Sequence, residues 1–149
     1  MDPIDLKIKS IYNSKYLDEA FYASEDAAGF DLIAAIHNDW PLVPGHSVLI
    51  PTGLLMEIPK GYFGDVRPRS GLACKHQIVI LNAPGTIDRD YRNQVMVCLY
   101  NLSKEIYTIK PEDRIAQMVI QPYRTAKFFR DGDLDETGRG LGGHGSSGR

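Results

Sequence analysis

The spacing of the prolines restricts this chain more than any other feature of its sequence. Eight of its nine prolines lie at positions 41, 44, 51, 59, 68, 84, 111 and 122. Proline interrupts a helix because it lacks a backbone N–H, so most of the middle of the chain has no room for a long helix. The stretches between the prolines are short and rich in strand-forming residues, at 31–36, 47–50, 54–58, 78–81, 94–100, 106–109 and 115–120. Short strands separated by glycine and proline turns predict an all-β fold, an antiparallel sandwich or barrel.

Three segments carry more detailed expectations. The run 95–100 is apolar throughout and predicts a central strand that is covered on both faces. Residues 70–76 predict one short helix, with Ser70 as its N-cap. Residues 17–28 contain helix formers but show weak periodicity, so that helix and loop both remain open there.

Length and composition limit the class of protein. A chain of 149 residues supports one domain, and a net charge of −2 argues against a nucleic acid polymer or an acidic membrane as partner. No apolar run approaches the roughly 20 residues that span a bilayer, and the start M-D-P-I-D-L-K-I-K lacks the apolar region of a secretory signal. The two cysteines, Cys74 and Cys98, are predicted to be reduced, buried thiols of a cytoplasmic protein.

The last twenty residues differ from the rest, which divides the chain into a β domain at 1–129 and a tail at 130–149. Seven of the 14 glycines lie in this tail, and Leu134 and Leu141 are its only aliphatic residues. Such a segment cannot bury enough apolar surface to order itself. The run R-G-L-G-G-H-G-S-S-G nevertheless places an arginine, a ring and two hydroxyl groups among glycines whose backbone can wrap an anion. A plain disordered tail and a flexible arm that closes over an anion are both open.

Two internal segments are candidates for chemistry. In P-R-S-G-L-A at 68–73, the N–H groups of a helix start and the charge of Arg69 would form an anion site, the alternative being a simple turn with a solvated arginine. In N-A-P-G-T-I-D-R-D-Y-R-N at 82–93, Asp88 and Asp90 would share one face if the chain is extended, with Tyr91 on the other. One of these carboxylates could hold a water as general base, the alternative being solvated turn aspartates.

Two further observations concern a buried amide and metals. Gln117 interrupts the apolar stretch after E-D-R, so its amide requires a partner, and neighbouring backbone would suffice. The four histidines, His37, His46, His76 and His144, show no spacing typical of a metal site, and no nucleophile elbow is present.

The order of the segments is more specific than any one of them. The chain reads A-A-G-F-D-L at 27–32, P-R-S-G-L-A at 68–73, G-T-I-D-R-D-Y at 85–91, D-R-I-A-Q at 113–117 and R-G-L-G-G-H-G-S-S-G at 139–148. Together they closely resemble the five ordered motifs of the trimeric dUTP diphosphatase (dUTPase) family. The resemblance implies a distorted jelly-roll fold with one short helix and a flexible glycine-rich arm. It also implies a homotrimer with active sites at subunit boundaries, and the hydrolysis of dUTP to dUMP and pyrophosphate, which limits uracil in DNA and supplies dUMP for dTTP synthesis.

The resemblance also implies roles for residues. Asp88 matches the catalytic aspartate that activates a water for attack on the α-phosphorus. Tyr91 matches the ring beneath the deoxyribose, Asp31 a residue near the metal–water network, and Met96 a further nucleotide contact. Magnesium is expected on the triphosphate and water, with no direct protein ligand. The remaining substrate-binding matches comprise the phosphate turn, the uracil hairpin, the fourth-motif glutamine and the closing arm: Arg69, Ser70, Gly71, Asn82, Thr86, Ile87, Gln117, Arg139, His144, Gly145, Ser146 and Ser147.

Three positions depart from the family pattern, and two alternatives remain. His144 stands where a phenylalanine is usual, and Asn93 and Glu112 each replace a common glycine. Asparagine tolerates a left-handed backbone, so the turn at Asn93 is expected to survive. A dCTP deaminase resembles this family, but its catalytic glutamate aligns with Cys98, and a thiol cannot replace that carboxylate. The other alternative is a non-catalytic nucleotide-sensing module.

Overall fold

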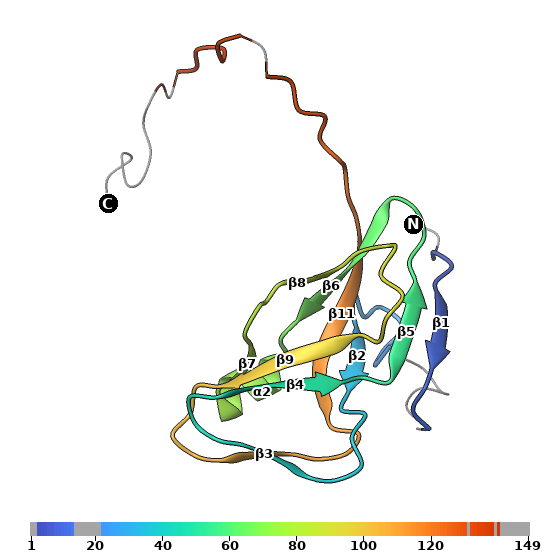
Figure 1. The fold of residues 1–149 in the computed structure, drawn as a ribbon, viewed down its shortest axis with the longest axis vertical. Helices are drawn as coiled ribbons and strands as arrows, with labels where there is room; N and C mark the ends of the chain where they lie inside the picture. Colours follow the sequence, from blue (N-terminus) through green and yellow to red (C-terminus); the bar gives the residue numbers. More distant parts are fainter. Residues whose placement is uncertain (1–2, 14–21, 131, 139, 141–149) are drawn as a thin grey trace.

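Two facing antiparallel sheets form the body of the protein. The computed structural model describes residues 3–13, 22–130, 132–138 and 140. One sheet has the strand order β2-β11-β6-β8 and the other β4-β9-β7, and two further pairs, β1-β5 and β10-β3, extend the body (Figure 1). The elements are β1 (Lys7–Ser10), β2 (Phe30–Ile33), β3 (Trp40–Leu42), β4 (Ser47–Pro51), β5 (Leu54–Glu57), β6 (Tyr62–Arg67), α2 (Ser70–His76), β7 (Ile78–Ile80), β8 (Gly85–Ile87), β9 (Met96–Asn101), β10 (Tyr107–Ile109) and β11 (Arg114–Pro122).

One apolar core holds the two sheets together. It includes Leu32 and Met118 from the four-stranded sheet and Ile50, Val97 and Leu99 from the three-stranded sheet, all at most 1% exposed. Successive residues of a strand point to opposite faces, so each strand contributes alternate side chains to this core. The prediction of a mostly β, sandwich-like fold with one short helix is confirmed, and the sheets do not close into a barrel.

The central strand β9 confirms one expectation and corrects another. It pairs with β4 on one side and β7 on the other, as expected for a central strand. Val95, Val97 and Leu99 are buried, whereas the alternate residues of β9, among them Met96 and Cys98, are only partly buried. The prediction that both faces are covered is therefore wrong for a single chain, because no layer of the described residues packs on the outer face of β9.

The sequence patterns gave no indication of β6, a strand of the four-stranded sheet. Its sequence YFGDVR contains a glycine and an aspartate, two residues that strands disfavour. The fold nevertheless requires the glycine, because a Cβ on Gly64 would lie 2.9 Å from the Met118 sulfur. Asp65 is buried but accepts hydrogen bonds from Arg67 and Gln121. The strands β1, β3 and β8 were also missed, and of these β3 contains Pro41 and β8 begins with Gly85, two residue types that strands disfavour.

The helix α2 forms where it was expected, but Ser70 does not cap it. Arg69 occupies the N-cap with an extended backbone and makes no side-chain capping bond, and Ser70 is the first helical residue. The described part of the uncertain segment, 22–28, contains no helix, and its earlier residues lie outside the described chain. Both cysteines are free, as expected, but Cys74 is exposed and Cys98 half-buried, so the prediction of buried thiols is wrong.

The chain leaves the body after β11. The Tyr123 N–H donates to the Gly61 carbonyl at 2.9 Å, and residues 124–130 then run away from the sheets (Figure 1). The described residues from 123 onward form no helix or strand, and Phe128, Phe129 and Leu134 are 89%, 75% and 96% exposed.

Candidate active site

Two arginines converge on Asp31 at one end of the four-stranded sheet. The Arg69 Nε lies 2.9 Å from Asp31 Oδ1, and an Arg114 Nη1 lies 3.2 Å from Asp31 Oδ2. Arg69 also donates from Nη1 to the Arg114 carbonyl at 3.0 Å. One carboxylate therefore orders two guanidinium groups, and the net charge of the three side chains is +1. Arg114 belongs to the fourth motif but received no role from its sequence, since only the pairing of β2 with β11 brings it to Asp31.

Gln117 lies in the same row of side chains. Its Cα is the partner of Asp31 on β2 and of Arg67 on β6. The Gln117 Nε2 donates to the Pro68 carbonyl at 3.0 Å, which confirms that backbone satisfies this amide. A Cβ on Gly29 would lie 3.3 Å from Gln117 Oε1, so the glycine of the first motif allows the glutamine to pack closely. The sheet register thus gathers parts of the first, second and fourth motifs.

The start of α2 continues this polar face. Ser70 and Gly71 are exposed, and the space where a Cβ would stand on Gly71 is open. The first helical bond runs from the Ala73 N–H to the Arg69 carbonyl. The preceding N–H groups therefore have no partner within the helix, and with Arg69 beside them they can donate to an anion.

The second polar group lies on a hairpin. The cis Ala83–Pro84 bond precedes β8, and Gly85 packs against Val66 of β6. Asp88 follows β8 directly and is exposed, and its carboxylate makes no hydrogen bond or ion pair within the described residues.

The chain turns after Asp88. Asp88 and Asp90 therefore do not lie on one face of an extended strand, the arrangement expected for an extended chain. The Tyr91 N–H donates to the Asp88 carbonyl at 3.1 Å, and its hydroxyl donates to the Gln94 carbonyl at 2.9 Å. Asp88 and Asp90 nevertheless line one cavity of about 620 Å³. Asn93 adopts no positive φ, and its Oδ1 accepts from the Gln94 N–H at 2.8 Å, so the turn forms without a left-handed backbone at Asn93.

The other hairpin residues named from the sequence lie nearby. Asn82 and Thr86 are exposed, and Ile87 and Met96 are half-buried. Asn82 Nδ2 lies 3.7 Å from the position that a Cβ would take on Gly85, so this amide lies beside the start of β8. The arm residues Arg139, His144, Gly145, Ser146 and Ser147 lie outside the described residues.

The two polar groups are at opposite ends of β6. Ile87, the residue before Asp88, pairs with Gly64, while Arg69 lies five residues further along the chain. An extended chain rises about 3.3 Å per residue, so these five residues separate Arg69 from the Gly64–Ile87 pair by about 17 Å. A single chain therefore does not bring the exposed Asp88 close to its own turn of Arg69, Ser70 and Gly71, which is called the arginine turn below.

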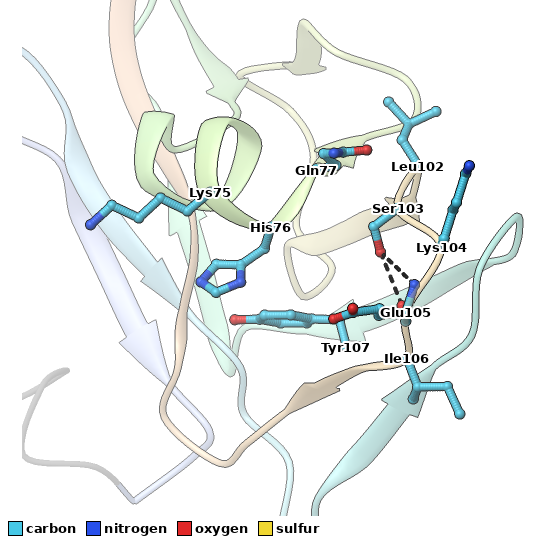
Figure 2. Close-up of a pocket in the computed structure, with 9 residues that line it drawn as sticks. All are labelled: Lys75, His76, Gln77, Leu102, Ser103, Lys104, Glu105, Ile106 and Tyr107. Carbon is cyan, nitrogen blue, oxygen red and sulfur yellow. Dashed lines mark hydrogen bonds between the residues drawn. The ribbon is translucent and has the colours of Figure 1, made fainter.

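Another cleft, of about 450 Å³, lies at the other end of α2 and contains none of the site residues predicted from the sequence (Figure 2). Its rings, His76 and Tyr107, have centroids 5.1 Å apart. Burial and the Asp113 carboxylate raise the pKa of Tyr107 above its ordinary value, and the Arg69 charge opposes them.

The described part of the chain contains no group of three or more His, Cys, Asp or Glu side chains arranged to hold a metal ion. Across 3–13, 22–130, 132–138 and 140, no helix has the length and apolar character to cross a membrane.

Fold and site together define a β-sandwich protein with an arginine turn that presents unpaired N–H groups and with an exposed carboxylate on a hairpin. A sequence profile of the dUTPase family matches residues 16–148. A deoxyuridine 5'-triphosphate nucleotidohydrolase of Rhizobium etli is 49% identical over 148 residues, covering 98% of this chain and 95% of the relative. A protein of the same name from a Wolbachia of Drosophila simulans is 47% identical over 148 residues, covering 98% of this chain and 97% of that relative. The dUTPase of Staphylococcus bacteriophage 80alpha, solved as a G164S mutant with dUpNHpp, superposes with a TM-score of 0.80 at 26% identity, covering 97% and 99%. The chain therefore belongs to the dUTPase family.

Proposed function

We propose that this member of the dUTPase family hydrolyses dUTP to dUMP and pyrophosphate with Asp88 as the catalytic base. The observation that carries this assignment is the exposed Asp88 carboxylate, which has no partner within the described residues and follows a hairpin strand directly. An unpaired carboxylate can accept a hydrogen bond from a water and take its proton. The water oxygen bonds to the α-phosphorus, the bond from that phosphorus to the bridging oxygen breaks, and pyrophosphate leaves.

We propose that the arginine turn binds the phosphates. Arg69, Ser70 and Gly71 present a guanidinium group and unpaired N–H groups, and Gln117 lies beside them through its bond to the Pro68 carbonyl. Because Asp31 holds Arg69 by its Nε, the guanidinium orientation is fixed before a ligand arrives. Positioning and charge neutralisation dominate phosphoryl transfer, so a fixed cation lowers the barrier.

The hairpin is proposed to bind the nucleoside. Asn82, Thr86 and Ile87, with the backbone of β8, would pair with the edge of uracil, and mismatched buried polar groups would reject cytosine. The Tyr91 hydroxyl is engaged by the Gln94 carbonyl, which fixes the ring and leaves it 37% exposed for a sugar. Half-buried Met96 would add an apolar contact.

A homotrimer with sites at subunit boundaries is part of the proposal. The separation of Asp88 from the arginine turn within one chain supports it, because a neighbouring copy would complete the site. The outer face of the three-stranded sheet offers an apolar surface for such a copy. Leu49 and Leu81 are 57% and 56% exposed there, beside half-buried Cys98 and Tyr100.

Magnesium fits this site as a partner of the substrate. Mg²⁺ keeps several waters and binds through substrate phosphates and few carboxylates, so the triphosphate itself would supply its ligands. When bound it would neutralise charge on the triphosphate. Both oxygens of Asp31 face arginines, so we propose that Asp31 reaches the metal only through water and mainly orders Arg69 and Arg114.

The glycine-rich segment is proposed to close over the substrate, as an arm at 130–149 attached to a β domain at 1–129. Arg139, Ser146 and Ser147 would contact the outer phosphates, with Gly145 allowing the backbone to bend and His144 stacking on the base. Deleting residues 139–149 should therefore lower kcat/KM far more than it lowers the melting temperature. Full activity of the truncated protein would overturn the closing role.

Product analysis tests the proposal. The protein is incubated with dUTP, dCTP, dTTP or UTP, each with and without MgCl₂. We expect dUMP and pyrophosphate from dUTP alone, and a loss of kcat of about 10²- to 10⁴-fold in Asp88→Asn. The exposed Asp39 provides a charge-matched control, Asp39→Asn, which should keep its activity.

Three other results would contradict it. Ammonia released from dCTP would indicate a deaminase, although the relatives named above are nucleotidohydrolases and the resemblance aligns Cys98 with the deaminase glutamate. Tight dUTP binding without turnover would indicate a sensing module. An active Asp88→Asn variant would remove the catalytic role of this aspartate.

We also propose that the protein acts in the cytoplasm, where its two free thiols would persist.

A further inference from the structure

The sheet register places one more arginine beside Gln117. Arg67 is the last residue of β6, and its Cα is the partner of Gln117 on β11, whose other partner is Asp31 on β2. Directly opposed residues on neighbouring strands point to the same face, with Cβ atoms about 5 Å apart. Arg67 therefore shares the polar face of Asp31 and Gln117, one strand further across the sheet.

A buried carboxylate fixes this arginine. Asp65 Oδ2 accepts from Arg67 Nε at 2.9 Å and from Arg67 Nη2 at 2.7 Å, and the Gln121 amide donates to the same oxygen at 2.8 Å. The Asp65 side chain is only 9% exposed, whereas the Arg67 side chain is 46% exposed. Two of the three guanidinium nitrogens are thus held on the buried side, and Nη1 makes no hydrogen bond within the described residues.

Stability alone explains this arrangement poorly. Asp65 Oδ1 is buried without a hydrogen-bond partner in the described chain, so the carboxylate is only half satisfied. A well-packed apolar pair of similar volume is often at least as stable as a buried ion pair. An arginine held rigidly by two of its nitrogens is suited instead to binding a phosphate, because less side-chain freedom is lost when the anion arrives.

We propose that Arg67 is a further substrate-binding residue, which contacts the phosphate chain of the nucleoside triphosphate through Nη1, and that Asp65 is the positioning residue that holds it. This inference rests on the proposed function, in which Gln117 and Arg69 bind the phosphates. Arg67 extends that group of donors along the sheet toward β8.

The test varies the number of phosphates on the ligand. Binding of dUMP, dUDP and a non-hydrolysable imido analogue of dUTP is measured by titration calorimetry in MgCl₂, for the unaltered protein, Arg67→Met and Arg67→Lys. Lys9→Met, on the exposed edge strand β1, changes the net charge equally and serves as the matched control. Arg67→Met should weaken the triphosphate analogue tenfold or more, since charge-assisted bonds are the strong ones. It should change dUMP binding less than about twofold, and Arg67→Lys should recover part of the loss.

A kinetic cycle tests the role of Asp65. Asp65→Asn should raise KM for dUTP with little change in kcat, and this increase should disappear when Arg67 is already methionine. Equal weakening of all three ligands, an altered oligomeric state in sedimentation, or an Asp65→Asn effect that persists beside Arg67→Met would each overturn the inference. These outcomes are separable from failure of the proposed function, because Asp88→Asn and the product assay test that function without Arg67.

Discussion

Glu112 stands in a turn that favours glycine, and its replacement should stabilise the protein. Its φ is +64°, and the Asp113 N–H donates to the Lys110 carbonyl at 3.1 Å. Pro111 precedes it, so the four residues match a type II turn, whose third position requires positive φ. The glycine that the family commonly has here would meet this requirement without strain.

The expected gain follows from two opposing terms. A residue with a Cβ pays roughly 1–2 kcal/mol in the left-handed region. Glycine avoids that cost but gives the unfolded chain more freedom, which costs about 0.5–1 kcal/mol. Glu112→Gly should therefore stabilise by about 0.5–1 kcal/mol, and a chain of this length shifts its melting temperature by about 1–4 °C in response.

The assay is thermal and urea unfolding at fixed protein concentration, because assembly would make the melting temperature depend on concentration. Glu112→Ala is the matched control, since it removes the same charge and keeps the Cβ. Alanine should give no gain. If alanine and glycine stabilise equally, the effect comes from the charge and the argument from backbone strain is wrong.

Three further predictions concern other described residues. Gln77 ends α2 with φ +56°, where helices favour glycine, so Gln77→Gly should raise the free energy of unfolding by about 0.5–1 kcal/mol in urea titration, and no gain would contradict the strain. Asn101 is fully buried, donates to the Leu42 and Glu105 carbonyls, and accepts two bonds from Ser103. Asn101→Ala should cost about 2–4 kcal/mol in the same titration, because these partners lose their bonds, and a loss below 1 kcal/mol would mean that water replaces the amide. Burial raises the pKa of Tyr107, so the folded state keeps the phenol neutral above about pH 10, where the unfolded chain ionises. The contribution of Tyr107 to the free energy of unfolding is complete below about pH 10 and is lost as the pH rises through the raised pKa. Tyr107→Phe should therefore flatten the fall in stability at alkaline pH. Parallel stability profiles of the two proteins against pH would contradict the shift.

The sequence determined the outline of the fold because its signals are local. Proline spacing excluded long helices, and apolar β-rich runs predicted most of the longer strands, including β9 and β11. It failed at β6, because Gly64 and Asp65 disfavour a strand locally and are accepted through contacts with Met118 and Gln121 of β11, which is distant in the sequence. The Ser70 cap failed for a related reason, since the helix begins one residue earlier than the capping pattern suggested, with Arg69 at the N-cap and Ser70 as the first helical residue.

For the site, the sequence determined which residues are present and in what order, and five ordered motifs indicated the family. Only the tertiary structure decided which of them meet. The pairing of β2, β11 and β6 brings Asp31, Gln117 and Arg67 into one row, although they are separated by dozens of residues in the chain. The same register sends Asp88 to the opposite end of β6 from Arg69. Strand register depends on long-range backbone pairing, and a linear pattern of residue types does not contain that information.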